Sequence, residues 1–285
     1  MVSIIERIVE GFKIWRKGWL SFILAVILLS FAFTVFLIPA MFGVTTIAGY
    51  FESGSIVSVA IIAFAITVLT IAFSFVVIGT ICGLGKELIE IEDTRAENTL
   101  HYIKSYGLKF AAIGLIITTI VLGPFIVVGI IFNFINILPI ISSDLVAGIA
   151  FVIIIFIVAF FLFAPFTLAI PACLIEDDVG PSVSIKNSFH AFRKDPKTIS
   201  GLLASFIIIF VALLILPIIG LIGITEATSL LLLVSILGVF TAIGFFVSLF
   251  IVLPVMCVTF TKLYYDYKIP EKEEVSEEES PISLF

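Results

Sequence analysis

The sequence predicts an all-α membrane protein with six transmembrane helices, and three observations support that prediction. Hydrophobic residues make up 61% of the 285 residues and charged residues only 13%, whereas an ordinary soluble domain has about 45–50% and about 25%. The apolar residues form six continuous runs, each reaching the roughly 20 residues that a transmembrane helix needs. The runs are continuous rather than alternating, so a transmembrane β-barrel is excluded.

The six predicted spans follow one another along the chain. They are approximately Leu20–Phe42, Ile56–Leu84, Leu108–Phe132, Leu145–Ile175, Ile199–Ile222 and Ser229–Thr261. The even-numbered spans contain about 30 residues each, or about 45 Å of helix, which exceeds a hydrocarbon core of about 30 Å. We therefore expect these spans to tilt, kink or project from the membrane, with kinks at Pro165, Pro171 and Pro254.

The basic residues predict the orientation of the chain. All 15 Lys and Arg residues lie before the first span, between spans two and three (with Lys109 at the very start of span three), between spans four and five, or after span six. Cytoplasmic loops carry the excess of Lys and Arg in membrane proteins. The sequence therefore predicts a multi-pass protein of the cell (cytoplasmic) membrane with both termini in the cytoplasm.

Short basic segments precede the odd-numbered spans and align without gaps at offsets of 88 and 89 residues. They are Glu10–Arg16, Asn98–Lys104 and Asn187–Arg193, which we call elbows one, two and three. Their bulky apolar residues are three positions apart and share one helix face, so each elbow predicts an amphipathic helix in the headgroup plane. The predicted fold is three repeats of elbow plus helical hairpin, at about 1–90, 91–178 and 179–267, around an axis along the membrane normal.

Local signals predict how the elbows begin and how the domain ends. Thr94 to Glu97 has the pattern of a capping box for elbow two, and Pro181 suits the first turn of the helix containing elbow three. Residues 268–285 form an acidic tail with six Glu between positions 271 and 279. A segment of this composition is predicted to be disordered.

Four basic residues of the elbows are the candidate binding residues: Lys13, Arg16, Lys104 and Arg193. They are expected to bind lipid headgroups or a partner protein at the cytoplasmic face. The bulky residues Trp15, Ile103 and Phe192 are expected to hold the elbows at interfacial depth. The alternative is that the bases only fix topology, which explains the charge bias but not the repeated spacing.

Other chemistry-bearing residues favour structural roles. The outer-loop acids Glu52, Asp144 and Glu226 could form a cation-attracting ring, although capping of the following helices is the favoured interpretation. The two histidines, His101 and His190, lack the further ligands of a metal site. The three cysteines, Cys82, Cys173 and Cys257, lie in apolar runs and are interpreted as buried apolar residues. No metal and no cofactor is expected.

Three classes of function remain open from the residues. The leading hypothesis is a non-enzymatic membrane protein that organises lipids or partner proteins through its cytoplasmic elbows. The alternative is a channel or transporter for a neutral or amphipathic solute along the repeat axis, without the ionisable residues at membrane depth that ion coupling needs. An enzyme using cytoplasmic carboxylates is the third, and the chain has no nucleotide-binding or hydrolase motif. No nucleic-acid partner is expected.

One segment resembles a known family. Ala164-Pro165-Phe166 leads through Glu176-Asp177-Asp178-Val179-Gly180 to Ser184 and Ser188. This pattern, and the basic-aromatic opening at residues 12–19, resembles uncharacterised polytopic membrane proteins common in archaea. These are related to the membrane-anchoring domain of bacterial glycerophosphodiester phosphodiesterases.

The resemblance covers most of residues 1–267 and implies a membrane module of unknown activity. The phosphodiesterase chemistry of those relatives belongs to a separate soluble barrel, so no catalytic residue is carried over. An amino-acid composition rich in Ile, Lys and Glu and lacking Gln is compatible with a thermophilic source.

Overall fold

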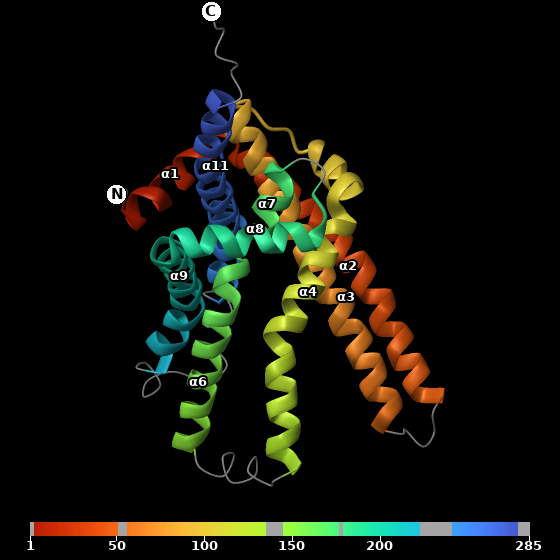
Figure 1. The fold of residues 1–285 in the computed structure, drawn as a ribbon. Coiled ribbons are helices and arrows are strands. Elements are labelled where there is room, and N and C mark those ends of the chain that lie inside the picture. The colour runs from red at the N-terminus through yellow and green to blue at the C-terminus, as the bar shows by residue number, and fades with distance from the viewer. Residues whose placement is uncertain (1–2, 51–55, 135–144, 177–178, 223–240, 279–285) are drawn as a thin grey trace, which may run out of the picture.

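The computed structural model describes residues 3–50, 56–134, 145–176, 179–222 and 241–278. All the elements within these ranges are helical (Figure 1). They are α1 (Ile4–Lys17), α2 (Trp19–Tyr50), α3 (Ile56–Glu90), α4 (Asn98–Phe134), α6 (Leu145–Phe163), η1 (Ala164–Phe166), α7 (Ala169–Ile175), α8 (Pro181–Lys194), α9 (Pro196–Ile222), η2 (Ser248–Val252) and α11 (Leu253–Glu278). The outer-loop acids Glu52, Asp144 and Glu226 fall outside the described residues.

Five helical stretches in the described ranges are long and apolar enough to cross a membrane. They are Ile66–Glu90, Asn98–Pro124, Ile154–Ile175, Pro196–Leu213 and Thr241–Lys268. The pair formed by Ile4–Lys17 and Trp19–Ala32 passes the same test together, bent by 82°, and gives a sixth. The all-helical prediction is confirmed, with five or six helices able to span a membrane, as expected of a multi-pass membrane protein.

Proline interrupts two of the long spans, as predicted. The fourth span breaks at Ala164–Phe166, a 3₁₀ turn centred on Pro165, before α7 continues it. The sixth contains a π-helical segment, Ser248–Val252, which ends just before Pro254. Proline lacks the N–H of a regular helix and its ring clashes with the carbonyl four residues earlier, so the helix changes its winding at both places.

The elbows form two separate helices rather than three. Helix α1 ends at Gly18, where the chain turns by 82° into α2, and α8 is separated from α9 by Asp195. The expectation of a separate elbow two is wrong, because α4 is continuous from Asn98 to Phe134. Asp195 precedes Pro196, which disfavours the helical conformation before it, whereas nothing between Lys104 and the third span forces a break.

The tail also differs from its prediction. Helix α11 continues to Glu278, so residues 268–278 are helical rather than disordered, while residues 279–285 lie outside the described range. Extending an existing helix avoids the cost of nucleation, and the abundant Glu and Lys of this segment are good helix formers.

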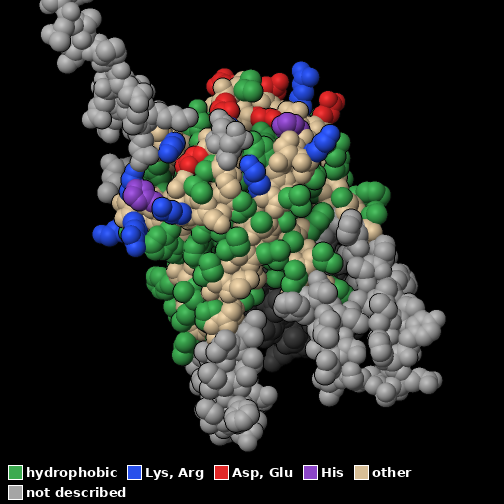
Figure 2. Space-filling view, turned by 45° about the vertical axis from the view of Figure 1, so that its right-hand side comes forward, with side chains coloured by type: hydrophobic (Ala, Val, Ile, Leu, Met, Phe, Trp, Pro, Cys, Tyr) green, Lys and Arg blue, Asp and Glu red, His purple; other side chains and the backbone are tan. Residues whose placement is uncertain are grey.

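The core lies between the charged end of the bundle and the middle of the spans. The sixth span, Thr241–Lys268, which contains most of α11, is its central element, because half of the residues in its most apolar 18-residue stretch are buried, against 28–33% in the other spans. Small residues allow close packing beside it: a Cβ on Gly79 of α3 would lie 2.3 Å from the Phe110 ring of α4. Lys, Arg, Asp and Glu side chains gather at one end of the molecule, and apolar side chains cover the part below (Figure 2).

Candidate functional site

The four candidate bases are all exposed, and they lie on three different helices. Lys13 and Arg16 belong to α1, Lys104 to α4 and Arg193 to α8. Within the part of the chain that the structure describes, no hydrogen bond or ion pair joins any two of them, so they form three separate elements of one charged surface rather than a single pocket.

An exposed apolar side chain accompanies a base on the same face of each elbow. The pairs are Phe12 with Arg16, Leu100 with Lys104, and Phe189 with Arg193, each four positions apart. Residues at this spacing are neighbours on a helix surface. In elbow three the contact is direct, because the Arg193 guanidinium lies 4.7 Å from the centre of the Phe189 ring.

The opposite face of each elbow is buried against the bundle through a small residue. Gly11, Thr99 and Ser188 are aligned in the three elbows, and all three are buried. A Cβ on Gly11 would lie 2.0 Å from Oγ1 of Thr259 in α11, so only glycine fits there without a shift. The small residue therefore sets how closely each elbow can approach the span beneath it.

Ser188 also forms hydrogen bonds to the backbone of the fourth span where that helix is interrupted. Its hydroxyl donates to the Pro165 carbonyl over 2.8 Å and accepts from the Leu168 N–H over 3.1 Å. These backbone groups need outside partners because the helix is interrupted at Pro165. Elbow three thus supplies a partner for two backbone groups that the break in the helix leaves unpaired.

The role predicted for Trp15 is corrected. Trp15 is only 7% exposed and belongs to the core, and Ile103 and Phe192 also pack against that core. The residues available to the interface are instead Phe12, Leu100 and Phe189. The reason is helical geometry: the position next to the buried small residue points outward, and the position four residues after the small residue points inward.

The starts of the elbow helices are only partly as predicted. Pro181 is the first residue of α8, as expected. The predicted capping box at Thr94 is wrong, since α4 begins at Asn98 and the Thr94 hydroxyl donates to Glu87 over 3.0 Å. A capping box is present at α1 instead, where Ser3 and Glu6 exchange hydrogen bonds.

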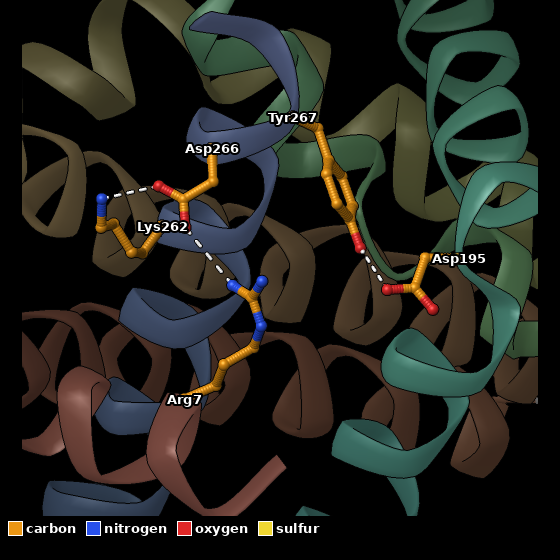
Figure 3. Close-up of polar contacts among 5 residues, drawn as sticks. All are labelled: Arg7, Asp195, Lys262, Asp266 and Tyr267. Carbon is orange, nitrogen blue, oxygen red and sulfur yellow. Dashed lines mark hydrogen bonds and ion pairs between the residues drawn. The ribbon is translucent and has the colours of Figure 1, made fainter. Parts of the chain in front are cut away.

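Polar contacts fasten α11 to two elbow regions (Figure 3). Asp266 of α11 accepts from Arg7 of α1 over 3.3 Å and pairs with Lys262 over 2.6 Å. Tyr267 donates to Asp195, at the junction of α8 and α9, over 3.2 Å. Burial acts to raise the pKa of Asp195, but hydrogen bonds from Thr198 and Tyr267 and the charge of Arg7 outweigh it and lower the pKa below its ordinary value.

Two glutamates make matching contacts that the sequence did not reveal. Glu87, in the last turn of α3, accepts from the side-chain amide of Asn98 at both carboxylate oxygens, over 3.0 and 2.9 Å. Glu176, at the end of α7, accepts from Asn187 and from Tyr264, and Lys268 lies 3.6 Å away. Each glutamate precedes its asparagine by 11 residues. That equal spacing was the available signal.

The histidines and cysteines do not assemble into a metal site within the described residues. His101 and His190 are both exposed. Cys82, Cys173 and Cys257 are free and buried, and the Cys82 Sγ lies 4.0 Å from the Cys257 carbonyl oxygen. No group of three His, Cys, Asp or Glu side chains that could hold a metal ion occurs in the described ranges.

One cavity between the long spans is small and lined mostly by apolar side chains. A cavity of about 70 Å³ lies against Ile78 and Cys82 of α3, Ile170 of α7, and Met256 and Cys257 of α11. Two thiol contacts close α3 against α11 beside it: the Cys82 thiol lies against the Cys257 carbonyl, and the Cys257 thiol lies 3.9 Å from the Ile78 carbonyl oxygen. The lining offers apolar contacts and carries no charged group.

Comparison with known proteins does not assign the chain. Models of protein families, curated proteins and solved structures were compared with it, and none of them matches.

Proposed function

We propose that this protein is a non-enzymatic integral membrane protein that binds anionic lipid headgroups at the cytoplasmic leaflet through its three elbows. The observation that carries the proposal is the two-sided construction of each elbow. One face buries a small residue on the bundle, and the other exposes an apolar residue and, four positions later, a base.

The exposed pairs suit the boundary between hydrocarbon and headgroups. An apolar ring or Leu side chain is stable at the edge of the hydrocarbon, while Lys and Arg extend their charged ends toward the headgroups. A base near an anionic membrane surface contributes about 1 kcal/mol. Three equivalent bases, Arg16, Lys104 and Arg193, therefore contribute up to about 3 kcal/mol, less where salt screens them.

Threefold repetition of the fold is part of the proposal, and the pattern of burial supports it. Applying the offsets of 88 and 89 residues to the odd-numbered spans matches residues that are at most 1% exposed in all three repeats. The matched sets are Phe22, Phe110 and Ile199; Ala25, Ile113 and Leu202; and Leu29, Ile117 and Phe206. Three unrelated hairpins would have no reason to bury the same positions.

The acid-to-elbow contacts also support a cyclic arrangement. Glu87 ends the first hairpin and binds Asn98 of elbow two, and Glu176 ends the second and binds Asn187 of elbow three. Asp266, near the end of the sixth span, binds Arg7 on the helix that contains elbow one. The last hairpin is thereby joined to the first, as expected for repeats around a central axis.

The cytoplasmic position of both termini is likewise proposed, and labelling tests it. Single cysteines at Ser105, Lys194 and Ser276 are expected to react with an impermeant thiol reagent only from the inside of sealed vesicles. Single cysteines at the outer-loop positions Ser53, Ser143 and Thr228 are expected to react from the outside. One residue on the wrong side would refute the arrangement of three hairpins.

A solute path along the repeat axis has less support. The cavity near Cys82 and Cys257 measures about 70 Å³ and is apolar, and a hydrated pathway needs polar groups or a wider opening.

The relationship to the membrane domain of glycerophosphodiester phosphodiesterases is a separate proposal that rests on residues 164–188 and 12–19. Neither idea is needed for lipid binding.

The test of lipid binding compares the wild type with the Arg16→Gln, Lys104→Gln, Arg193→Gln triple variant. After both have been inserted in equal amount and orientation, native mass spectrometry counts retained phosphatidylglycerol molecules. A matched control variant, Lys17→Gln, changes a base on α1 that pairs with Glu92 over 3.0 Å. The triple variant is expected to retain less phosphatidylglycerol than the control. Equal retention would refute lipid binding and favour a protein partner at the elbows.

A further inference from the structure

A groove beside elbow one is lined entirely by apolar side chains and is open along one side. It measures about 270 Å³ and lies between α1, α9 and the segment joining η2 to α11. The side chains that line it are Ile8, Val9, Phe12, Phe206, Ile209, Ile251, Val252 and Val255. Phe206, Val252 and Val255 are buried and form its floor, whereas Val9, Phe12 and Ile209 are exposed along its rim.

From these features we infer that the groove holds one acyl chain of an anionic phospholipid whose headgroup binds Lys13 and Arg16. The inference rests on the proposed function and adds a specific site to it. The apolar lining offers water no hydrogen-bonding partner, and beside a lipid bilayer the material available to fill the groove is hydrocarbon.

The bases lie where a headgroup would be. Lys13 is four residues after Val9, and Arg16 is four residues after Phe12, so each base sits about 6 Å along the helix from a rim residue. Both bases are exposed, and neither forms an ion pair with the rest of the described chain. A lipid chain in the groove therefore emerges beside two available positive charges.

The groove exists because of two irregularities in the fold. The 82° turn between α1 and α2 lays α1 across the bundle instead of along it (Figure 1). The π-helical segment Ser248–Val252 shifts the winding of the sixth span just where Ile251 and Val252 line the groove. Such single-turn π segments occur frequently at functional sites. Among the helices that contain elbows, the groove is lined by α1, through Ile8, Val9 and Phe12, so the site is assigned to elbow one.

Burial alone does not select this lipid from the bilayer. Lipid tails are as apolar as the groove, so moving a chain into the groove gains no hydrophobic free energy. The selectivity comes from the two bases. At about 1 kcal/mol each, they favour an anionic over a zwitterionic headgroup by up to about thirtyfold, and by less in physiological salt.

Filling the groove tests the inference. Val9→Phe with Ile209→Phe narrows the rim, and Ile208→Phe is the matched control, since Ile208 is an exposed neighbour on α9 outside the groove. Native mass spectrometry of protein released from mixed phosphatidylglycerol and phosphatidylcholine membranes is expected to show one lipid fewer per protein in the filled variant. Equal lipid counts in the filled variant, the control and the wild type would overturn the inference.

A fluorescence measurement on protein with an unaltered groove tests the inference even if the filled variant does not fold. The Trp15 ring lies 5.3 Å from the Phe12 ring at the groove rim, and Trp19→Phe leaves Trp15 as the only tryptophan. Phosphatidylglycerol with brominated chains is expected to quench Trp15 more strongly than brominated phosphatidylcholine does. Equal quenching would refute selection of an anionic lipid.

The two proposals fail in different ways. Loss of one lipid on filling the groove, with unchanged retention in a Lys104→Gln, Arg193→Gln double variant that keeps Lys13 and Arg16, would contradict headgroup binding by elbows two and three but not the groove. Reduced retention in the triple variant, with no effect of filling, would contradict only the groove. A change in particle mass by light scattering on filling, with unchanged lipid, would identify the occupant as a second copy of the chain and overturn the lipid assignment.

Discussion

Ser188→Ala is expected to destabilise the bundle out of proportion to the single oxygen atom that it removes. The Ser188 side chain is fully buried, and its hydroxyl serves two backbone groups of the fourth span, the Pro165 carbonyl at 2.8 Å and the Leu168 N–H at 3.1 Å. Alanine leaves both groups without that partner, and the Leu168 N–H is buried.

The magnitude follows from the number of groups left unpaired. Leaving one buried polar group unsatisfied costs about 1–3 kcal/mol in soluble proteins, whereas polar contacts between membrane helices average about 0.6 kcal/mol. Since Ser188 serves two groups in a tightly packed site, we expect a loss of about 1–4 kcal/mol in the free energy of unfolding.

Equilibrium unfolding in mixed detergent micelles, followed by circular dichroism, measures this loss. Ser182→Ala is the matched control, because Ser182 lies on the same helix and is exposed, so its replacement is expected to change the free energy by less than about 0.5 kcal/mol. A loss in Ser188→Ala no larger than in Ser182→Ala would refute the idea that elbow three repairs the proline break.

Three further perturbations test the packing and the polar contacts. Gly79→Ala is expected to lower the free energy of unfolding by about 1–3 kcal/mol through overpacking. The control Gly123→Ala, with nothing within 4 Å of the added Cβ, is expected to leave it nearly unchanged. Equal effects of the two variants in the same unfolding assay would contradict the close α3–α4 contact. Asp266→Asn weakens two ion pairs of a side chain that is only one-third exposed, so it is expected to lower the free energy of unfolding by about 1–2 kcal/mol. Glu92→Gln, in an exposed pair, is expected to lower it by less than about 0.5 kcal/mol. A larger loss in Glu92→Gln than in Asp266→Asn would contradict the role of Asp266. The lowered pKa of Asp195 stabilises the fold at pH values above the ordinary carboxyl pKa of about 4, and this contribution is lost as pH falls through the lower folded pKa. Asp195→Asn is therefore expected to reduce the loss of unfolding free energy between neutral and acid pH. An unchanged pH dependence in the variant would contradict this role of Asp195.

Composition and run length predict the helices well because they act locally. A run such as Leu145–Ile175 has no charge to place in water, and in a membrane its backbone must satisfy its own hydrogen bonds, which a helix does. The effects of Pro165 and Pro254 were predictable for the same reason, since each removes a donor within its own helix.

Contacts between distant segments could not be predicted in the same way. Arg7 and Asp266 are 259 residues apart, and Ser188 and Pro165 meet only because elbow three folds back on the fourth span. The errors have a common cause as well. Residue type alone predicts an interfacial Trp15, and a four-residue pattern predicts a helix cap at Thr94, although the packed surroundings decide both.

The elbows connect the predicted lipid surface to the stability of the bundle. The same turn of α8 that places Arg193 over Phe189 on the outside places Ser188 against the Pro165 break on the inside. In α1, the face containing Phe12 and Arg16 is opposed by Gly11, which lies against Thr259 of the central helix. A lipid bound on the outer face therefore restrains a helix whose inner face holds a long span in place. Because a ligand that binds only the folded state stabilises it, the proposed binding of anionic lipid at the elbows is expected to stabilise the spans as well.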